Sequence, residues 1–385
     1  MKDFTILSGL NPEDYGSRKV AVAMSGGIDS SLTAILLKDA GFEVFGLTMK
    51  LWDHSQSGTS DDSGGCCDLS AFQDAKFVAG AAGIPHYTVN LREQFNQLII
   101  HNFVAEYLTG RTPNPCVLCN TLIKWRALSQ KARALGCDLI ATGHYARVAR
   151  FGDNTFSLMT GLDSAKDQSY FLWGLDSLNL RHTLFPLGTM SKEQTRTEAL
   201  KRNLKTAHRS ESQEICFIPD NDYGRFLRHY IEENIPGTLQ EGNILDSNGT
   251  VIGKHRGTAY YTIGQRKGIG LALGYPVYVT AVNADDNTIT IGKKEDLQSD
   301  LLFAGKINWI RGFPPDNEFD CQTRIRYRQK SVKSTVKVTD RGVTVRFNSP
   351  QYAITPGQSA VFYTGDMVLG GGIIESAEFT HKADL

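Results

Sequence analysis

The stretch AVAMSGGIDSSLTA, residues 21–34, constrains the fold more than any other segment, because an apolar run meets a glycine pair and serines. Residues 19–24 predict a buried strand and residues 30–38 predict a helix. A glycine turn between them points free backbone N–H groups at the helix N-terminus, where an anion binds well. The turn lacks the lysine of a Walker A loop and the glycine spacing of a dinucleotide-binding turn. On the glycines alone, a plain tight turn is an equal alternative.

Strands and helices alternate through the first half of the chain. Further strands are predicted at 42–49, 85–90 and 137–142, and helices at 70–82, 91–108, 121–135 and 191–204. Two helices are expected to start with capping boxes, Ser70 with Gln73 and Ser191 with Gln194. The alternation predicts an α/β fold with a doubly wound parallel sheet.

The sequence changes character after about residue 225, where short β-branched runs are separated by glycines. Runs such as PVYVTAV, TITIG, GVTVRF and SAVFYT predict two smaller β-rich units, the last a β-barrel. We therefore expect an α/β domain over 1–225, a central β-rich domain over 226–295 and a C-terminal barrel over 296–385. The low-complexity stretch 55–65, with Cys66 and Cys67 at its edge, is expected to be a mobile loop.

Composition narrows the functional classes only slightly. Lys plus Arg and Asp plus Glu number 41 each, and this balance excludes no charged partner because binding follows the local distribution of charge. No apolar run reaches the roughly 20 residues of a membrane helix, and the start of the chain lacks the features of a signal or transit peptide. A cytoplasmic protein is expected, in which the seven cysteines are reactive, metal-binding or inert rather than a disulfide framework.

Three cysteines stand in segments that suggest chemistry. Cys116 and Cys119 lie in TPNPCVLCN, which predicts a proline-stiffened loop just before a helix, and Cys216 lies in SQEICFIPD. A thiolate near a helix N-terminus is reactive because its pKa is lowered. Small buried hydrophobes or half of a zinc site are the alternatives, although no second C-x-x-C follows. Cys137 and Cys321 are expected to be structural.

A family resemblance extends over nearly the whole chain. S-G-G-x-D-S after an apolar strand resembles the pyrophosphate loop of the ATP-pyrophosphatase superfamily, and the chain resembles the tRNA-specific 2-thiouridylases within it. The segments that carry this resemblance are AMSGGIDSS, LTMKLW, GCCDLSAFQDA, TPNPCVLCNTLIKW, ATGHYAR, KDQSYFLWGL, SQEICFI, GKHRGTAYYTIGQRKGIG, RIRYRQ and PGQSAVFY. The resemblance implies ATP-dependent 2-thiolation of the wobble uridine, U34, with pyrophosphate and AMP as products.

The resemblance also implies a set of site residues. ATP would bind at Ala23, Met24, Ser25, Gly26, Gly27, Ile28, Asp29, Ser30, Met49 and Gly143, with Asp29 helping to hold Mg²⁺ or the leaving pyrophosphate. Cys216 would carry a persulfide and Cys119 would be its nucleophilic partner, so that a Cys119–Cys216 disulfide follows sulfur transfer. The tRNA would be contacted by Asn114, Pro115, Cys116, His144, Lys166, Asp167, Gln168, Arg326, Tyr327 and Gln358.

The resemblance implies partners as well. These are the anticodon loops of tRNAs for lysine, glutamate and glutamine, and a sulfur donor such as a cysteine desulfurase or a persulfide relay protein. The central domain would be a tRNA-binding domain. Many family members carry aspartate where this chain has Cys116, so the role of that carboxylate does not transfer. Cys116, Cys119 and Cys216 are instead compatible with an iron–sulfur cluster that leaves one iron open, or Cys116 is a redox-active thiol.

Two basic stretches predict contact with a phosphate backbone. In TRIRYRQK, a strand would place Arg324, Arg326, Arg328 and Lys330 on one face. The segment GKHRGTAYYTIGQRKGIG adds Lys254, Arg256, Arg266 and Lys267. A solvated strand face is the alternative for the first stretch taken alone.

Two other classes of function remain open from the residues. A synthetase that adenylates a small-molecule carbonyl would need neither reactive cysteines nor a basic β domain. A non-enzymatic RNA-binding or metal-binding module would release no AMP with any substrate. Thiolation of a different uridine, such as position 8, would yield 4-thiouridine in place of 2-thiouridine.

Overall fold

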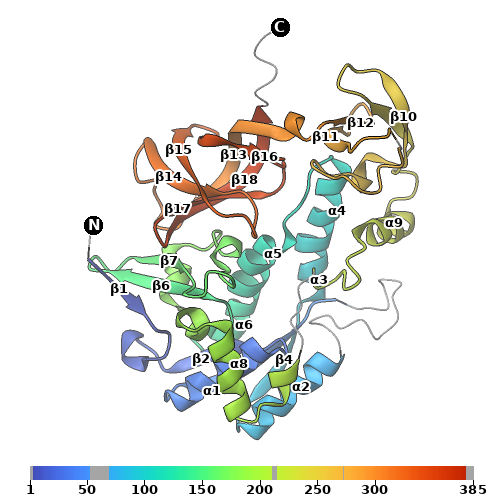
Figure 1. Cartoon of the computed structure of the whole chain (residues 1–385). Helices are drawn as coiled ribbons and strands as arrows, with labels where there is room; N and C mark the ends of the chain where they lie inside the picture. Colours follow the sequence, from blue (N-terminus) through green and yellow to red (C-terminus); the bar gives the residue numbers. More distant parts are fainter. Residues whose placement is uncertain (1–2, 53–68, 210–214, 272, 379–385) are drawn as a thin grey trace.

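The structure, a computed structural model, describes residues 3–52, 69–209, 215–271 and 273–378. The predicted loop 55–65 and the cysteines Cys66 and Cys67 lie outside these residues. An α/β part carries two β-rich parts, a barrel drawn in orange and red and a smaller sheet drawn in yellow (Figure 1). Within the described ranges, no helix has the length and apolar character needed to cross a membrane.

A five-stranded parallel sheet forms the centre of the α/β part, as predicted. Its strands, in spatial order, are β4 (His86–Asn90), β3 (Glu43–Lys50), β2 (Lys19–Ala23), β5 (Leu139–Ala141) and β8 (Thr183–Leu184). The chain proceeds outward from β2 to β4 and then returns to β5 on the other side of β2. This reversal creates a switch point, where the loops at the carboxyl ends of two neighbouring strands diverge and leave room for a ligand.

Helices connect these strands, and most lie where the sequence predicts them. Their bounds are α1 (Ile28–Asp39), α2 (Leu69–Ala81), α3 (Arg92–Phe95), η3 (Asn96–Ile100), α4 (His101–Leu108), α7 (Ser177–Arg181), α8 (Lys192–Lys201) and α9 (Tyr223–Asn234), with short turns η1 (Pro12–Asp14), η5 (Ser169–Phe171), η6 (Pro186–Thr189), η7 (Lys205–His208), η8 (Thr258–Tyr260) and η9 (Glu295–Leu297). The capping box of Ser191 and Gln194 is confirmed at α8. The box predicted at Ser70 is wrong, because α2 already begins at Leu69 and the Ser70 hydroxyl accepts a hydrogen bond from Arg209 instead.

The helix that bears the cysteines begins earlier than predicted. Segments α5 (Pro115–Leu118), η4 (Cys119–Leu128) and α6 (Ser129–Ala134) follow one another without a break. Cys116 and Cys119 therefore lie in the first turns of this helix, and the predicted loop is wrong. Pro115 explains the early start, because proline at the first helical position supplies a suitable φ and loses no hydrogen bond there.

The predicted C-terminal barrel is confirmed as a closed antiparallel sheet. Hydrogen bonds run in the order β18, β13, β16, β15, β14 and β17 and then back to β18, over β13 (Gln298–Trp309), β14 (Glu318–Arg324), β15 (Val332–Thr339), β16 (Gly342–Tyr352), β17 (Ser359–Thr364) and β18 (Met367–Glu378). The smaller sheet has the order β10, β9, β12 and β11, formed by β9 (Gly242–Leu245), β10 (Val251–His255), β11 (Tyr278–Asn283) and β12 (Thr288–Gly292).

The barrel sheet continues into the N-terminal half of the chain, which the sequence did not indicate. Strands β1 (Phe4–Leu7), β6 (Ala146–Phe151) and β7 (Phe156–Thr160) extend it, because β7 pairs with β18. The barrel is thus joined to the α/β part by main-chain hydrogen bonds. The domain limits near residues 225 and 295 stay predictions.

The basic run after β14 does not form the predicted strand face. Strand β14 ends at Arg324, and residues 325–331 are turns and irregular backbone. Arg324 pairs with Asp167 at 3.0 Å and its guanidinium lies over the Tyr363 ring. Arg326 is partly buried and donates to the carbonyl oxygen of Ala353. The alternating pattern failed because these two side chains found partners in other segments.

Asn308 joins the barrel to the α/β part through two partly buried hydrogen bonds. Its Nδ2 donates to the carbonyl oxygens of Trp173 at 2.7 Å and Leu175 at 2.8 Å. The Trp173 indole in turn donates to the Ser359 hydroxyl of β17 at 3.0 Å. These bonds join strands β13 and β17 of the barrel to the segment around Trp173.

We predict that Asn308→Ala lowers the free energy of unfolding by about 2 kcal/mol, because two carbonyl oxygens lose their donor. The thermal midpoint should fall by about 3 °C in a melting experiment. Asn317→Ala is the control, since Asn317 is exposed and should change the midpoint by less than about 1 °C, the effect of an ordinary surface substitution. Equal midpoints for the two variants would show that Asn308 does not join the parts.

Candidate active site

A cleft of about 2090 Å³ lies between the α/β part and the two β-rich parts. Most of the residues predicted for a site line it, although they come from distant segments. These residues are Ser25, Gly27, Ile28, Asp29, Ser30, Met49, Pro115, Cys116, Cys119, His144, Lys166, Asp167, Gln168, Cys216, Arg326, Tyr327 and Gln358. Five predicted residues are not among the lining residues: Ala23, Met24, Gly26, Asn114 and Gly143. Any effect they have on the site acts through the residues that line it.

The glycine turn lies at the switch point of the parallel sheet and is tightly constrained. The Ser30 hydroxyl accepts a hydrogen bond from the Ser25 backbone N–H at 3.1 Å and donates to the Gly27 carbonyl at 3.2 Å. Gly26 has φ +76°, and a Cβ there would overlap the carbonyl oxygen of Ala71 in α2. A Cβ on Gly143 would lie 2.9 Å from the Ser30 backbone nitrogen. Gly26 and Gly143 therefore allow close packing around the turn.

Asp29 has partners that the sequence did not reveal. Lys192 donates to both carboxylate oxygens of Asp29, at 2.7 and 2.8 Å, and the Tyr145 hydroxyl contacts one of them at 2.9 Å. The Lys192 side chain is 12% exposed and occupies the first position of α8. The capping box at Ser191 predicted where that helix begins, but only folding places its N-terminus against α1.

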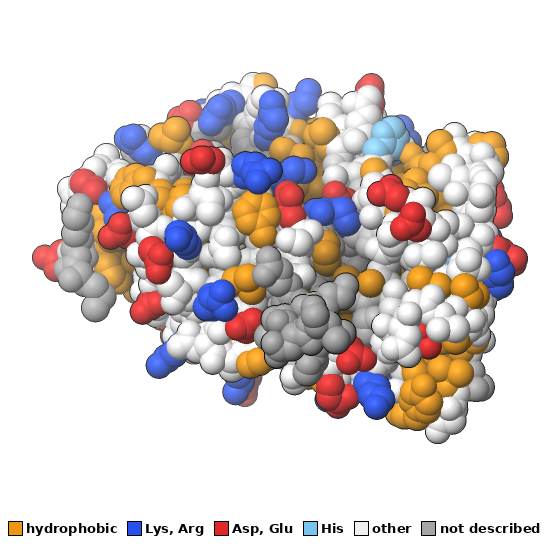
Figure 2. Space-filling view, turned by 90° about the horizontal axis from the view of Figure 1, so that it is seen from above, with side chains coloured by type: hydrophobic (Ala, Val, Ile, Leu, Met, Phe, Trp, Pro, Cys, Tyr) orange, Lys and Arg blue, Asp and Glu red, His pale blue; other side chains and the backbone are white. Residues whose placement is uncertain are grey.

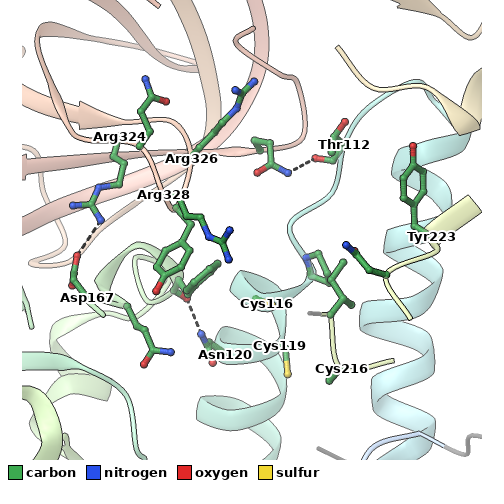
Figure 3. A pocket seen from close by; sticks show the side chains of 18 of the residues that line it. Thr112, Cys116, Cys119, Asn120, Asp167, Cys216, Tyr223, Arg324, Arg326 and Arg328 are labelled. Atoms are coloured by element: carbon green, nitrogen blue, oxygen red, sulfur yellow. Dashed lines mark hydrogen bonds and ion pairs between the residues drawn. The ribbon is translucent and has the colours of Figure 1, made fainter. Parts of the chain in front are cut away.

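Cys119 and Cys216 face the cleft from two different segments (Figure 3). Both are partly buried, and neither forms a disulfide in this structure. Phe217 fixes the position of Cys216, because its ring is 1% exposed and packs 5.2 Å from Phe103 and 5.3 Å from Phe226, between ring centroids. No pattern in the sequence indicated this aromatic anchor.

Cys116 is exposed to the cleft, in the turn before Cys119. Solvent reaches it, yet the surrounding walls desolvate the thiolate and raise the pKa of the thiol above its usual range, with Lys124 opposing this. Across the described residues, no three His, Cys, Asp or Glu side chains gather closely enough to hold a metal ion. An iron–sulfur ligand set of Cys116, Cys119 and Cys216 stays a prediction.

His144 lies at the end of β5 and is held in a neutral form. Its Nδ1 shares a 2.7 Å hydrogen bond with the Thr142 hydroxyl, and its ring packs beside Trp125. Desolvation, followed by the charge of Lys124, lowers the pKa of His144 well below its usual value. Protonation at neutral pH is therefore unfavourable, and the ring offers the cleft an uncharged imidazole.

Gln358 and Asp167 connect segments of the wall. The Gln358 amide donates to the carbonyl oxygens of Thr112 at 3.1 Å and Pro113 at 3.0 Å, directly before the cysteine helix (Figure 3). Asp167 is 4% exposed, and its carboxylate accepts from the backbone N–H groups of Gly161 and Ser169 and from Arg324. These contacts are structural, and direct contacts of both residues with tRNA stay predictions.

Comparison with known proteins identifies the family. A family profile described as "tRNA methyl transferase HUP domain" matches residues 18–220, followed by a "tRNA methyl transferase PRC-barrel domain" at 225–293 and an "Aminomethyltransferase beta-barrel domain" at 299–374. A tRNA-specific 2-thiouridylase of Geotalea uraniireducens is 48% identical over 95% of this chain and 97% of that protein. One of Carboxydothermus hydrogenoformans is 49% identical over 94% of this chain and 98% of that protein. The chain belongs to the tRNA-specific 2-thiouridylase family.

Among solved structures, the U34-tRNA thiolase NcsA from Methanococcus maripaludis with its [4Fe-4S] cluster aligns with 60% of this 2-thiouridylase chain and 70% of its own. The sequence identity is 19% and the TM-score is 0.35. Values this low do not transfer a cluster or a mechanism.

The cleft of this 2-thiouridylase is strongly basic, although the whole chain is neutral. Ten Lys or Arg residues are among the described residues that line it: Lys124, Lys166, Lys192, Arg209, Lys267, Lys294, Arg324, Arg326, Arg328 and Lys330. The acidic residues in the same lining are Asp29 and Asp167, and each is paired with a cation. Several Lys and Arg side chains also lie close together on the upper face (Figure 2). The local field therefore favours a polyanion such as a nucleotide or RNA.

We predict that Gly26→Ala weakens ATP binding at least tenfold in calorimetry, because the new Cβ displaces the turn from α2 and misaligns its N–H groups. Gly41→Ala is a matched control, since Gly41 has φ +88° but an added Cβ would meet no atom within 4 Å. It should lose about 1 kcal/mol of stability from strain and keep its affinity. Equal affinities for the two variants would contradict this role of Gly26.

Proposed function

We propose that the chain catalyses ATP-dependent 2-thiolation of the wobble uridine of tRNA. The main observation is that one basic cleft contains the glycine turn, Cys119, Cys216 and the cationic walls of both β-rich parts. Binding two polyanions requires the cations, and a synthetase that adenylates a small-molecule carbonyl would not need the thiols. The names of the curated relatives support the same reaction.

The first half-reaction is adenylation at the glycine turn. The C2 carbonyl oxygen of uridine attacks the α-phosphorus of ATP and pyrophosphate leaves, so that AMP becomes the leaving group on C2. Backbone N–H groups at the start of α1 would hold the phosphates, with Lys192 and Arg209 nearby in the cleft. Mg²⁺ usually takes one or two carboxylates and phosphate oxygens as ligands. Asp29 would be the carboxylate ligand, and it would share its oxygens between Mg²⁺ and Lys192.

The second half-reaction is sulfur transfer from a persulfide on Cys216. In one route the terminal sulfur attacks C2 and expels AMP, and the Cys119 thiolate then cleaves the S–S bond and leaves the sulfur on C2. In the other route Cys119 attacks the persulfide first and releases hydrosulfide, which attacks C2. Both routes end with a Cys119–Cys216 disulfide that must be reduced. Neutral His144 would lie beside the reacting base without adding charge.

The finer assignments are part of this proposal. The sulfur would come from a cysteine desulfurase or a persulfide relay protein. The acceptors would be tRNAs for lysine, glutamate and glutamine, with the unpaired anticodon base entering the cleft at little cost. No step is assigned to an iron–sulfur cluster.

We predict that Cys119→Ser and Cys216→Ser each reduce 2-thiouridine formation at least 1000-fold, because each removes a thiol that forms or breaks a bond to sulfur. AMP formation that depends on tRNA should continue in both variants. Nucleoside mass spectrometry and an AMP assay measure the two steps separately.

Cys321→Ser is the matched control, since Cys321 is buried in the barrel beside the Thr323 and Ser334 hydroxyls, which a serine can also bond. It should retain full activity. Retained thiolation in either active-site variant would contradict the two-cysteine mechanism. AMP formation with small carbonyl compounds but not with tRNA would favour a synthetase, 4-thiouridine would indicate another uridine, and tRNA binding without AMP formation would favour a binding module.

We predict that Lys192→Met slows tRNA-dependent pyrophosphate release about 100-fold, because the Asp29 carboxylate loses its cation and repels the phosphates of ATP. The dissociation constant for tRNA should stay within about twofold, since tRNA makes most of its contacts elsewhere in the cleft. Lys201→Met on the same helix is the control, because Lys201 is exposed and pairs with Glu198, outside the cleft lining. A wild-type rate for Lys192→Met would exclude its role in adenylation.

A further inference from the structure

Cys116 is a thiol of the cleft that the proposed function leaves without a role. It lies three residues before Cys119, at the start of the unbroken helix that runs from Pro115 to Ala134. Residues three apart on a helix share one face, with Cβ atoms about 5–6 Å apart. Cys116, Cys119 and Cys216 all line the same cleft, the first two from one helix and Cys216 from another segment.

The pair has the arrangement of a redox C-x-x-C motif. In such motifs two cysteines at the start of a helix exchange between dithiol and disulfide forms. Here the first cysteine is exposed and the second is partly buried. A disulfide requires the two Cβ atoms to approach to about 3.5–4.5 Å, so the first turn must tighten slightly. The turn can do so, because no side-chain hydrogen bond caps this helix at Asn114.

We propose that Cys116 resolves the disulfide left after each sulfur transfer and so frees Cys216 for the next persulfide. This inference rests on the proposed function. The Cys116 thiolate attacks Sγ of Cys119 in the Cys119–Cys216 disulfide. The Cys119–Cys216 bond breaks, a Cys116–Cys119 bond forms, and Cys216 leaves as a thiolate that takes the proton Cys116 lost. No electrons are gained or lost in this exchange, and an external dithiol later reduces the Cys116–Cys119 disulfide.

The surroundings of Cys116 suit an attack that follows sulfur transfer. Desolvation by the cleft walls raises the pKa of its thiol, so Cys116 holds its proton until the departing Cys216 thiolate can accept it. Its exposure also makes it the point at which a bulky reductant enters, whereas Cys119 and Cys216 are partly buried. A reductant outside the cleft can therefore reach the disulfide through the exposed Cys116.

A single-turnover experiment tests the exchange. The full chain, persulfidated on Cys216, is mixed with unmodified tRNA, ATP and Mg²⁺ without reductant, alkylated in acid, and mapped by peptide mass spectrometry. The wild type should yield a Cys116–Cys119 disulfide and alkylated Cys216. For each 2-thiouridine that it forms, Cys116→Ser should retain one Cys119–Cys216 disulfide, and the control Cys321→Ser should behave as the wild type. A wild-type Cys119–Cys216 disulfide with alkylated Cys116 would overturn the proposal, as would alkylated Cys119 and Cys216 after turnover of Cys116→Ser.

Repeated turnover gives a second readout. With thioredoxin as the reductant, Cys116→Ser should turn over at least tenfold more slowly than the wild type. With dithiothreitol, which is small enough to enter the cleft, the two rates should agree within about twofold. Equal rates with thioredoxin would overturn the role of Cys116 as the entry point for reduction.

A redox titration separates this proposal from the proposed function, because it needs neither tRNA nor ATP. The full chain is equilibrated in glutathione buffers and its disulfides are mapped. Cys116–Cys119 should be the main disulfide among the three cleft cysteines, and Cys119–Cys216 should replace it in Cys116→Ser. A wild type that forms only Cys119–Cys216 overturns the exchange. If no 2-thiouridine forms in the wild type, the proposed function fails, and this titration still decides whether the exchange occurs.

Discussion

The cleft depends on how the segment before the cysteine helix is held between the other parts of the chain. The Thr112 backbone N–H donates to the Pro356 carbonyl at 2.8 Å, and Gln358 donates back to Thr112 and Pro113. The Thr112 hydroxyl also reaches the Thr262 hydroxyl of the central part at 3.2 Å. The barrel and the central part thus meet at one short segment, and the thiols lie directly below it.

Charge is arranged so that a neutral chain presents a basic site. The acidic side chains of the cleft lining are each paired with a cation, while Lys166, Arg326 and Arg328 also line the cavity. A basic cleft with low-dielectric walls concentrates field lines and attracts ATP and RNA without giving the whole surface a positive charge. His144 stays neutral in the same field, because desolvation and Lys124 both oppose its protonation. The His144 imidazole is therefore uncharged, although the lining around it is rich in cations.

Much of the catalytic half could be predicted from local patterns. The parallel sheet, the glycine turn, the α8 capping box and the barrel strands each follow from a short-range signal: apolar periodicity, a glycine pair, or Ser191 with Gln194. The two failures have different causes, one local and one tertiary. Pro115 started its helix six residues before the predicted position, since proline is favoured at the first helical position. The run from Arg324 to Lys330 lost its strand because two of its arginines bind groups that are distant in sequence.

The sequence by itself determined the chemical groups of this protein: a turn that can bind phosphate, three thiols in two segments, and enough basic residues to bind a polyanion. Only the tertiary structure decided which of these groups meet. Lys192 reaches Asp29 across 163 residues of sequence, and Phe217 fixes Cys216 within an aromatic cluster built from several elements. No periodic pattern in the sequence indicates either contact, because each forms where separately predicted elements pack together. Local propensity sets the elements, whereas the burial of apolar faces between them sets the site.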